Sequence, residues 1–120
     1  MSDVRTLLKK RPLLFDGGMG TYYKGAPGRE CEQANRLDPE GIRAIHRAYL
    51  AAGCRAIKTN TFAAHVSLVC ENEDDQKALI RAAYDLARRA GDAYDAAVFA
   101  DIGPAPTAPP HAISRWPNNF

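Results

Sequence analysis

"DPEGIRAIHRAYLAAGCRAIKTNTF", residues 38–62, contains an amphipathic helix followed directly by an apolar strand. Its opening Asp-Pro pair is a typical helix start, with the acid as N-cap and proline in the first turn. Apolar residues then recur at helical spacing, at Ile42, Ile45, Tyr49 and Ala52. Gly53 is a typical helix end. The pattern therefore predicts a helix over 38–53 and a buried strand over 54–62.

The same alternation extends to both sides of this stretch. "LLFD" (13–16) and "AAVFADIGP" (96–104) have the continuous apolar character of buried strands, and 74–94 has helical periodicity. The remaining expected elements are short helices over 3–10 and 63–70 and a long loop from Gly17 to Leu37. Apolar strands separated by amphipathic helices predict an α/β fold with a parallel sheet.

The composition is that of a single small globular domain. The chain has 120 residues, of which 46% are hydrophobic and 25% charged, with a net charge of +2. Such a balance argues against a nucleic-acid-binding face, and no apolar run approaches the roughly 20 residues of a membrane span. The three cysteines form no C-x-x-C pair, so neither a zinc site within the chain nor a disulfide framework is predicted. We expect a cytoplasmic protein with free thiols.

Small or polar residues follow each predicted strand. These residues are Asp16-Gly17-Gly18, Thr59-Asn60-Thr61 and Asp101-Ile102-Gly103. The carboxyl ends of parallel strands are where α/β folds bind ligands. The Asp16 carboxylate can pair with an ammonium group, while the bare N–H groups of Gly17 and Gly18 meet a carboxylate. Simpler interpretations stay open, in which Asp16 caps the turn and the side chains of 59–61 bond neighbouring backbone.

Nucleotide-binding motifs do not fit the glycines. The pattern from Gly18 lacks the third glycine of a dinucleotide fingerprint, because Tyr23 stands there. Gly20 and Gly25 have phosphate-loop spacing, but the Lys-Ser/Thr pair that should follow is absent. His46, His65 and Cys54 are better explained as packing, capping or surface residues than as members of a functional site. Three loop residues, Arg29, Glu30 and Glu32, either touch a ligand or are solvated.

Three segments together resemble a known family. "LLFDGGMGT", "AIHRAYLAAGCRAIKTNTF" and "ADIGP" are similar, in the same order, to the first three βα units of the homocysteine S-methyltransferase domain. The family includes the betaine-dependent enzyme, a module of cobalamin-dependent methionine synthase, and bacterial fusions with methylenetetrahydrofolate reductase. The similarity covers about residues 7–104, so 1–104 is expected to be the N-terminal portion of that domain. Residues 105–120 are rich in proline and are expected to form an irregular tail.

The resemblance implies a (β/α)8 barrel that transfers a methyl group to the homocysteine thiol, giving methionine. In the family, a zinc ion held by three cysteines activates the substrate sulfur. Carried over by position, Asp16, Gly17 and Gly18 grip the amino and carboxylate groups of homocysteine. Thr59, Asn60 and Thr61 line the same pocket. The methyl donor stays open, with cobalamin- and folate-linked donors among the candidates.

The chain departs from the family pattern in two ways. Many members have an acid or amide before T-N-T-F, whereas this chain has Lys58, as in some of the fused bacterial enzymes. The family's zinc cysteines lie in later strands, and Cys31, Cys54 and Cys70 fall at other positions. We therefore expect an N-terminal fragment with no metal ligands or catalytic residues of its own, inactive alone. The alternative is a non-catalytic α/β binding module, which cooperative melting of the chain would favour.

Overall fold

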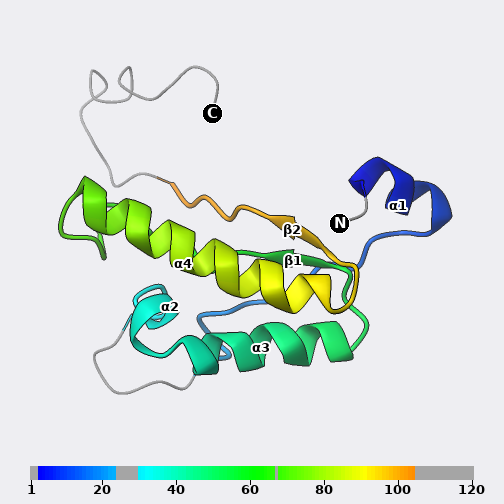
Figure 1. The fold of residues 1–120 in the computed structure, drawn as a ribbon, viewed down its shortest axis with the longest axis horizontal. Helices are drawn as coiled ribbons and strands as arrows, with labels where there is room; N and C mark the ends of the chain where they lie inside the picture. Colours follow the sequence, from blue (N-terminus) through cyan, green and yellow to red (C-terminus); the bar gives the residue numbers. More distant parts are fainter. Residues whose placement is uncertain (1–2, 24–29, 67, 105–120) are drawn as a thin grey trace.

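The computed structural model describes residues 3–23, 30–66 and 68–104. Within these ranges, two short parallel strands and four helices follow one another (Figure 1). The expected irregular tail over 105–120 lies outside the described residues, as does Arg29.

Each longer helix begins at a side chain that caps it. Asp3 accepts a hydrogen bond from the Arg5 N–H at the start of α1 (Val4–Lys10). Asp38 does the same for Gly41 in α3 (Pro39–Ala51), and Asn72 for Asp75 in α4 (Glu73–Asp92). These caps satisfy backbone donors that have no partner within the helix. The predicted cap Asp38 is confirmed.

The strands form a parallel sheet, as predicted. β1 (Ala56–Lys58) pairs with β2 (Ala97–Phe99) in the register Ala56 to Ala97. On the other edge of β1, Phe15 forms a parallel bridge to Ala56, and the Asp16 N–H donates to the Ala56 carbonyl at 3.0 Å. The spatial order is therefore the Phe15 segment, β1 and β2, which is also the chain order. The α/β class and its parallel pairing are confirmed.

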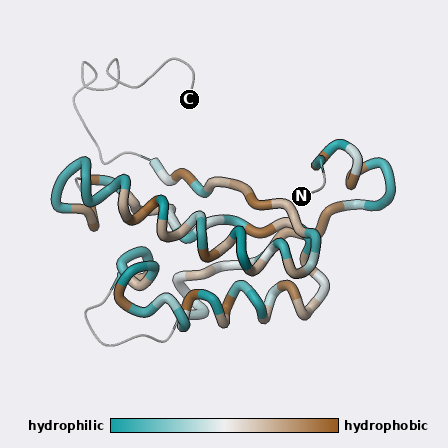
Figure 2. Tube along the Cα trace, viewed as in Figure 1, coloured by the Kyte–Doolittle hydropathy of each residue, from teal (hydrophilic) through white to brown (hydrophobic). Residues whose placement is uncertain are grey.

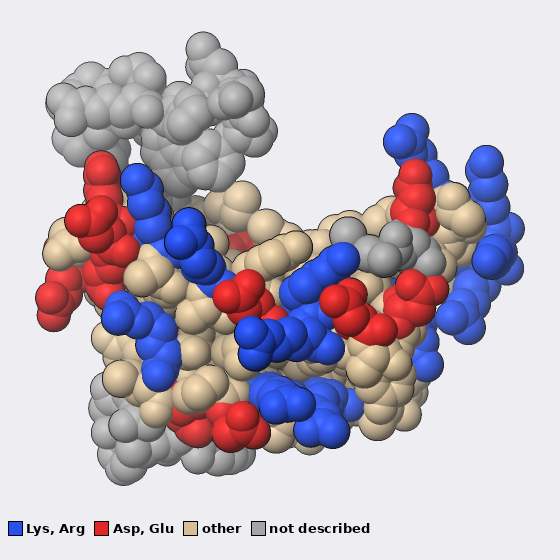
Figure 3. Space-filling view, viewed as in Figure 1, with Lys and Arg blue, Asp and Glu red and all other residues tan. Residues whose placement is uncertain are grey.

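Helices cover one face of this sheet. Leu50 of α3 and Ala87 and Ala90 of α4 pack with Ile57 of β1 in one buried cluster. Figure 1 shows α3 and α4 beside the strands, and Figure 2 shows apolar residues recurring along both helices. The outer surface of these helices has lysine and arginine mixed with acidic residues (Figure 3). Among the described residues, the opposite face of the sheet has no helix over it. The Phe15 and Phe99 rings lie 4.9 Å apart there, and Phe15 is 46% exposed.

Several predicted boundaries were wrong. The segment 13–16 forms a single bridge at Phe15, and the strands predicted over 54–62 and 96–104 are three residues each. A short helix, α2 (Ala34–Leu37), ends the region predicted as a loop. The predicted helix over 63–70 is a series of turns in its described residues. Boundaries of this kind are the part of a secondary-structure pattern that the sequence predicts least well.

Candidate functional site

The three strand ends meet at a cleft of about 220 Å³. Asp16, Gly17 and Gly18 line it from the first strand end, Lys58, Thr59 and Asn60 from the second, and Asp101 from the third. Glu32, from the loop before α2, and Phe62 also line the cleft. The structure therefore brings together five of the six predicted binding residues, because parallel strands end at the same edge of the sheet.

Asp16 is the buried acid of this cleft. Its Oδ2 atom accepts a hydrogen bond from the Lys58 backbone N–H at 3.2 Å, and its Oδ1 atom lies 3.8 Å from Lys58 Nζ. Within the described part of the chain, Oδ1 is buried and receives no hydrogen bond. Burial raises the pKa of Asp16, an effect that the Lys58 N–H and ammonium oppose. The cleft thus contains a carboxylate with one unsatisfied acceptor atom.

Gly17 and Gly18 are exposed next to Asp16, and Tyr49 of α3 fixes their position. The Tyr49 hydroxyl donates to the Gly18 carbonyl at 2.7 Å. A Cβ atom on Gly17 would lie 2.9 Å from that hydroxyl, so a larger residue would displace Tyr49. Neither glycine N–H donates a hydrogen bond within the described residues. Two backbone donors therefore remain available beside the buried carboxylate.

Thr59 and Thr61 are joined to Asp101 in a closed hydrogen-bond ring. The Asp101 N–H donates to Thr59 Oγ1 at 3.2 Å, and Thr61 Oγ1 donates to the Asp101 carbonyl at 2.6 Å. The two hydroxyls are 2.8 Å apart, and Thr59 is the donor between them because the Thr61 proton is already used. Both hydroxyls thus tie the ends of β1 and β2 together. Thr61 itself lines the neighbouring cavity, outside the Asp16 cleft.

Asn60 fastens the loop before α2 to the end of β1. Its Nδ2 donates to the Cys31 carbonyl at 2.8 Å, and its Oδ1 accepts from Cys31 Sγ at 3.2 Å. Asn35 Nδ2 donates to the Asn60 carbonyl at 2.7 Å. The same loop places Glu32 in the cleft, where its Oε2 accepts from the Ala63 N–H at 3.2 Å. The polar atoms of Asn60 are therefore used in positioning the loop.

A larger cavity of about 310 Å³ lies on the other side of the Thr59–Thr61 strand end. Its wall includes four exposed apolar or aromatic side chains, Phe62, Ile80, Tyr84 and Ile102. Thr59 and Asp101 line both cavities. We take the smaller cleft as the functional site because, of these two cavities of the described residues, it is the one that combines a buried unsatisfied carboxylate, a lysine and exposed glycine N–H groups.

Comparison with known proteins decides the family. The model of the family described as homocysteine S-methyltransferase matches residues 13–115. This chain belongs to the homocysteine S-methyltransferase family. Methionine synthase of Mycobacterium tuberculosis is 35% identical over 75 residues, and that of Mycobacterium leprae 31% over 77. Each alignment covers 55% of this chain and 6% of the relative.

A solved structure of the family has a similar fold. The crystal structure of the homocysteine methyltransferase MmuM from Escherichia coli, in its metallated form, superposes with a TM-score of 0.69 at 29% identity. The match covers 84% of this chain and 41% of that chain. The chain therefore corresponds to the N-terminal part of the family's domain, as the resemblance implied.

Three residues of the site had no assigned role at the sequence level. Lys58 appeared only as a departure from the family pattern, although its place directly before Thr59 puts it at the same strand end as the predicted ligands. Glu32 was one of three loop residues with no preference among them, since a long loop has no periodicity to show which side chain turns inward. Tyr49 was predicted from its helical stripe to be a core residue. Its hydroxyl instead reaches the Gly18 carbonyl.

The cysteines do not form a metal site. Cys54 Sγ donates to the Phe15 carbonyl at 3.3 Å and Cys31 Sγ to Asn60 Oδ1, while Cys70 is buried elsewhere. Burial raises the pKa of each thiol, in Cys31 to about 11 with help from the Glu32 charge. No cluster of three metal-binding side chains occurs in residues 3–23, 30–66 and 68–104. No helix in these ranges combines the length and apolar character needed to cross a bilayer.

Proposed function

We propose that this chain forms the amino-acid-binding part of a homocysteine S-methyltransferase site, in which a methyl group passes to the homocysteine sulfur and gives methionine. The observation that supports it most is the Asp16 carboxylate, with its unsatisfied Oδ1, beside the free N–H groups of Gly17 and Gly18. Asp16 binds the ammonium group of homocysteine, and the glycine N–H groups bind its carboxylate.

Thr59, Asn60 and Thr61 belong to the proposed site as the residues that shape it. Their hydroxyl and amide groups hold the ends of β1 and β2 and the loop of Glu32 in register. Thr59 and Asn60 also line the cleft directly, so a bound amino acid contacts them as part of its wall. The three residues thus position Asp16 and Lys58.

The proposed architecture is that of the first three βα units of a (β/α)8 barrel. The parallel order of the Phe15 segment, β1 and β2 supports it, as does the placement of α3 and α4 on one face. The rings of Phe15, which is exposed, and Phe99, which is half-buried, are on the face that a barrel would enclose. A cytoplasmic setting suits the three free thiols.

Zinc, which the family resemblance implies, does not fit the residues described here. Its ligands need thiolates gathered around one point, whereas these three thiols are separated, buried and raised in pKa. The sulfur end of homocysteine therefore has no partner in this part of the chain, and we propose that the chain alone does not complete methyl transfer. We likewise propose that the methyl donor, whether cobalamin- or folate-linked, is bound by residues outside the described ranges.

The separation and burial of the three thiols predict the metal content of the purified chain. Protein purified without chelators should contain far less than one zinc per chain by elemental analysis. The reason is that burial raises the pKa of all three thiols and so disfavours the thiolates that bind zinc. Replacing Cys31 with serine should leave the zinc content unchanged. Stoichiometric zinc that the Cys31→Ser change removes would contradict this assignment.

Homocysteine and its deaminated analogue, which keeps the thiol and the carboxylate, test the proposed function. We expect L-homocysteine to shift the NMR signals of the Gly17 and Gly18 amides with a dissociation constant in the millimolar range, since charge pairing alone contributes. The deaminated analogue should bind about tenfold more weakly, because it cannot pair with Asp16. Equal binding of the two compounds, or no response to homocysteine, would overturn the proposal.

A further inference from the structure

Lys58 stands beside Asp16 Oδ1, a buried side-chain atom of the cleft that receives no hydrogen bond from the described residues. Its Nζ atom is 3.8 Å from Asp16 Oδ1, too far for a hydrogen bond but close enough for charge attraction. The Lys58 side chain is 38% exposed, whereas that of Asp16 is 3% exposed. Lys58 can therefore move into solvent, while Asp16 stays where the Lys58 backbone N–H holds its Oδ2.

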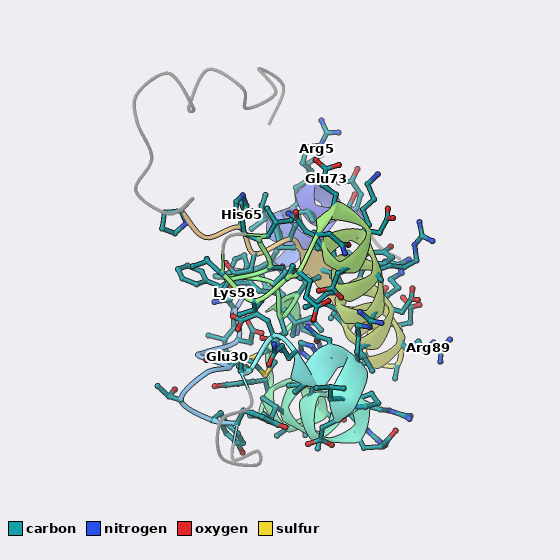
Figure 4. All side chains as sticks on the ribbon, turned by 90° about the vertical axis from the view of Figure 1, so that its left-hand side faces the viewer. Arg5, Glu30, Lys58, His65, Glu73 and Arg89 are labelled. Carbon is teal, nitrogen blue, oxygen red and sulfur yellow. The ribbon has the colours of Figure 1, made fainter. Side chains whose placement is uncertain are left out.

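The three N–H donors of the Lys58 ammonium are not committed elsewhere. Asp16 is its single ion-pair partner within residues 3–23, 30–66 and 68–104, and no hydrogen bond of Nζ occurs there. Figure 4 shows Lys58 on the opposite side of the ribbon from Arg89 of α4, away from the charged outer surface of the helices. Lys58 is thus a cation that lines the cleft, paired there with Asp16 through charge alone, and the cleft also contains Glu32 and Asp101.

A ligand ammonium that pairs with Asp16 Oδ1 comes close to the Lys58 ammonium, because Lys58 Nζ lies 3.8 Å from that oxygen. Oδ1 is buried and receives no hydrogen bond among the described residues, so we expect Lys58 to move as a second positive group approaches it. Two cations at one carboxylate repel each other, and a ligand with no negative group leaves that repulsion uncompensated. A carboxylate one carbon away from the ligand ammonium would draw Lys58 aside and pair with it.

We propose that Lys58 is a specificity-determining residue that restricts this cleft to zwitterionic α-amino acids. Before a ligand binds, Lys58 pairs with Asp16. When the ligand is bound, Lys58 binds the ligand carboxylate together with the Gly17 and Gly18 N–H groups. Asp16 is then left to the ligand ammonium. This inference rests on the proposed function and adds the reason why a simple amine is excluded. It also gives a role to a residue at which the chain departs from the acid or amide of many family members.

The test compares L-homocysteine with its decarboxylated analogue, a thiol amine without a carboxylate, on the full chain. NMR titrations followed at the Gly17 and Gly18 amides give both dissociation constants. We expect the wild type to prefer homocysteine by about tenfold or more, the strength of one charge-assisted contact. In Lys58→Met, homocysteine should bind about tenfold more weakly and the amine more tightly, so that the preference disappears. Lys58→Arg should restore it.

Lys77→Met, the same change at an exposed lysine of α4, is the matched control and should keep the wild-type preference. The amide spectrum of each variant shows whether its fold is retained. If Lys58→Met binds homocysteine and still prefers it as the wild type does, the role of Lys58 is overturned while the proposed function stands. If homocysteine shifts no signal of the wild-type cleft, the proposed function falls and the role of Lys58 with it.

Discussion

Replacing Asp16 with asparagine should weaken homocysteine binding by at least about tenfold without destabilising the fold. Asparagine has the shape of aspartate, and its side-chain oxygen can still accept the Lys58 backbone N–H that now bonds to Oδ2. The change removes the negative charge that would pair with the ligand ammonium. A loss of affinity would therefore report on the charge and not on the shape of the cleft.

Stability and binding should respond differently to this substitution. Burial raises the pKa of Asp16, which means that the folded chain holds the ionised form at a cost. A neutral isostere removes that cost, so the urea midpoint of Asp16→Asn at neutral pH should equal or exceed that of the wild type. Asp85→Asn, the same change at an exposed position of α4, is the control for a general effect of charge. A large drop in the midpoint of Asp16→Asn would assign Asp16 a structural role instead.

His46 should make the fold sensitive to acid. It is fully buried in α3, and neither ring nitrogen has a hydrogen-bond partner among the described residues. Burial lowers its pKa from 6.5 to about 4. Above pH 6.5 the ring is neutral in both the folded and the unfolded chain. Below that pH the unfolded chain takes up a proton that the folded chain refuses, so stability falls as the pH drops from 6.5 toward 4.

The expected loss from His46 is about 3 kcal/mol across that window. His46→Leu should remove it, because leucine fills much of the same space and has no proton to bind. Urea unfolding followed by circular dichroism at several pH values gives the difference between the two proteins. His65→Leu, at a partly exposed position in the turns before α4, serves as the control. Parallel stability curves for wild type and His46→Leu would show that His46 is not the source of the acid sensitivity.

The helical and strand periodicity of the sequence predicted the fold class. The parallel sheet of that class then predicted where the polar residues at the strand ends would lie. Once 38–62 is a helix followed by a strand, the polar residues at 16–18, 59–61 and 101–103 must gather at one edge of a parallel sheet. Strand lengths could not be predicted this way. The predicted strands extended to residues 62 and 104, but the pairing ends after three residues, where hydrogen bonds such as those of the Thr59–Thr61–Asp101 ring take over.

The chemical roles within the site were harder to predict. A sequence shows that Thr59, Asn60 and Thr61 are polar, but it does not show whether their polar groups face a ligand or are used by the protein. The structure gives those groups partners from loops that are about 29 to 42 residues away in the chain. Lys58 was visible as an unusual residue, and its meaning required the 3.8 Å distance to Asp16.

Binding of homocysteine at the Asp16 cleft is the central claim, and an NMR titration of wild type and Asp16→Asn tests it most directly. The Gly17 and Gly18 amides report on the cleft in both proteins. We predict saturable shifts of these signals in the wild type at millimolar homocysteine, and at least about tenfold weaker binding in Asp16→Asn with Asp85→Asn unchanged. Equal affinity of wild type and Asp16→Asn, or the absence of any shift in the wild type, would contradict the account.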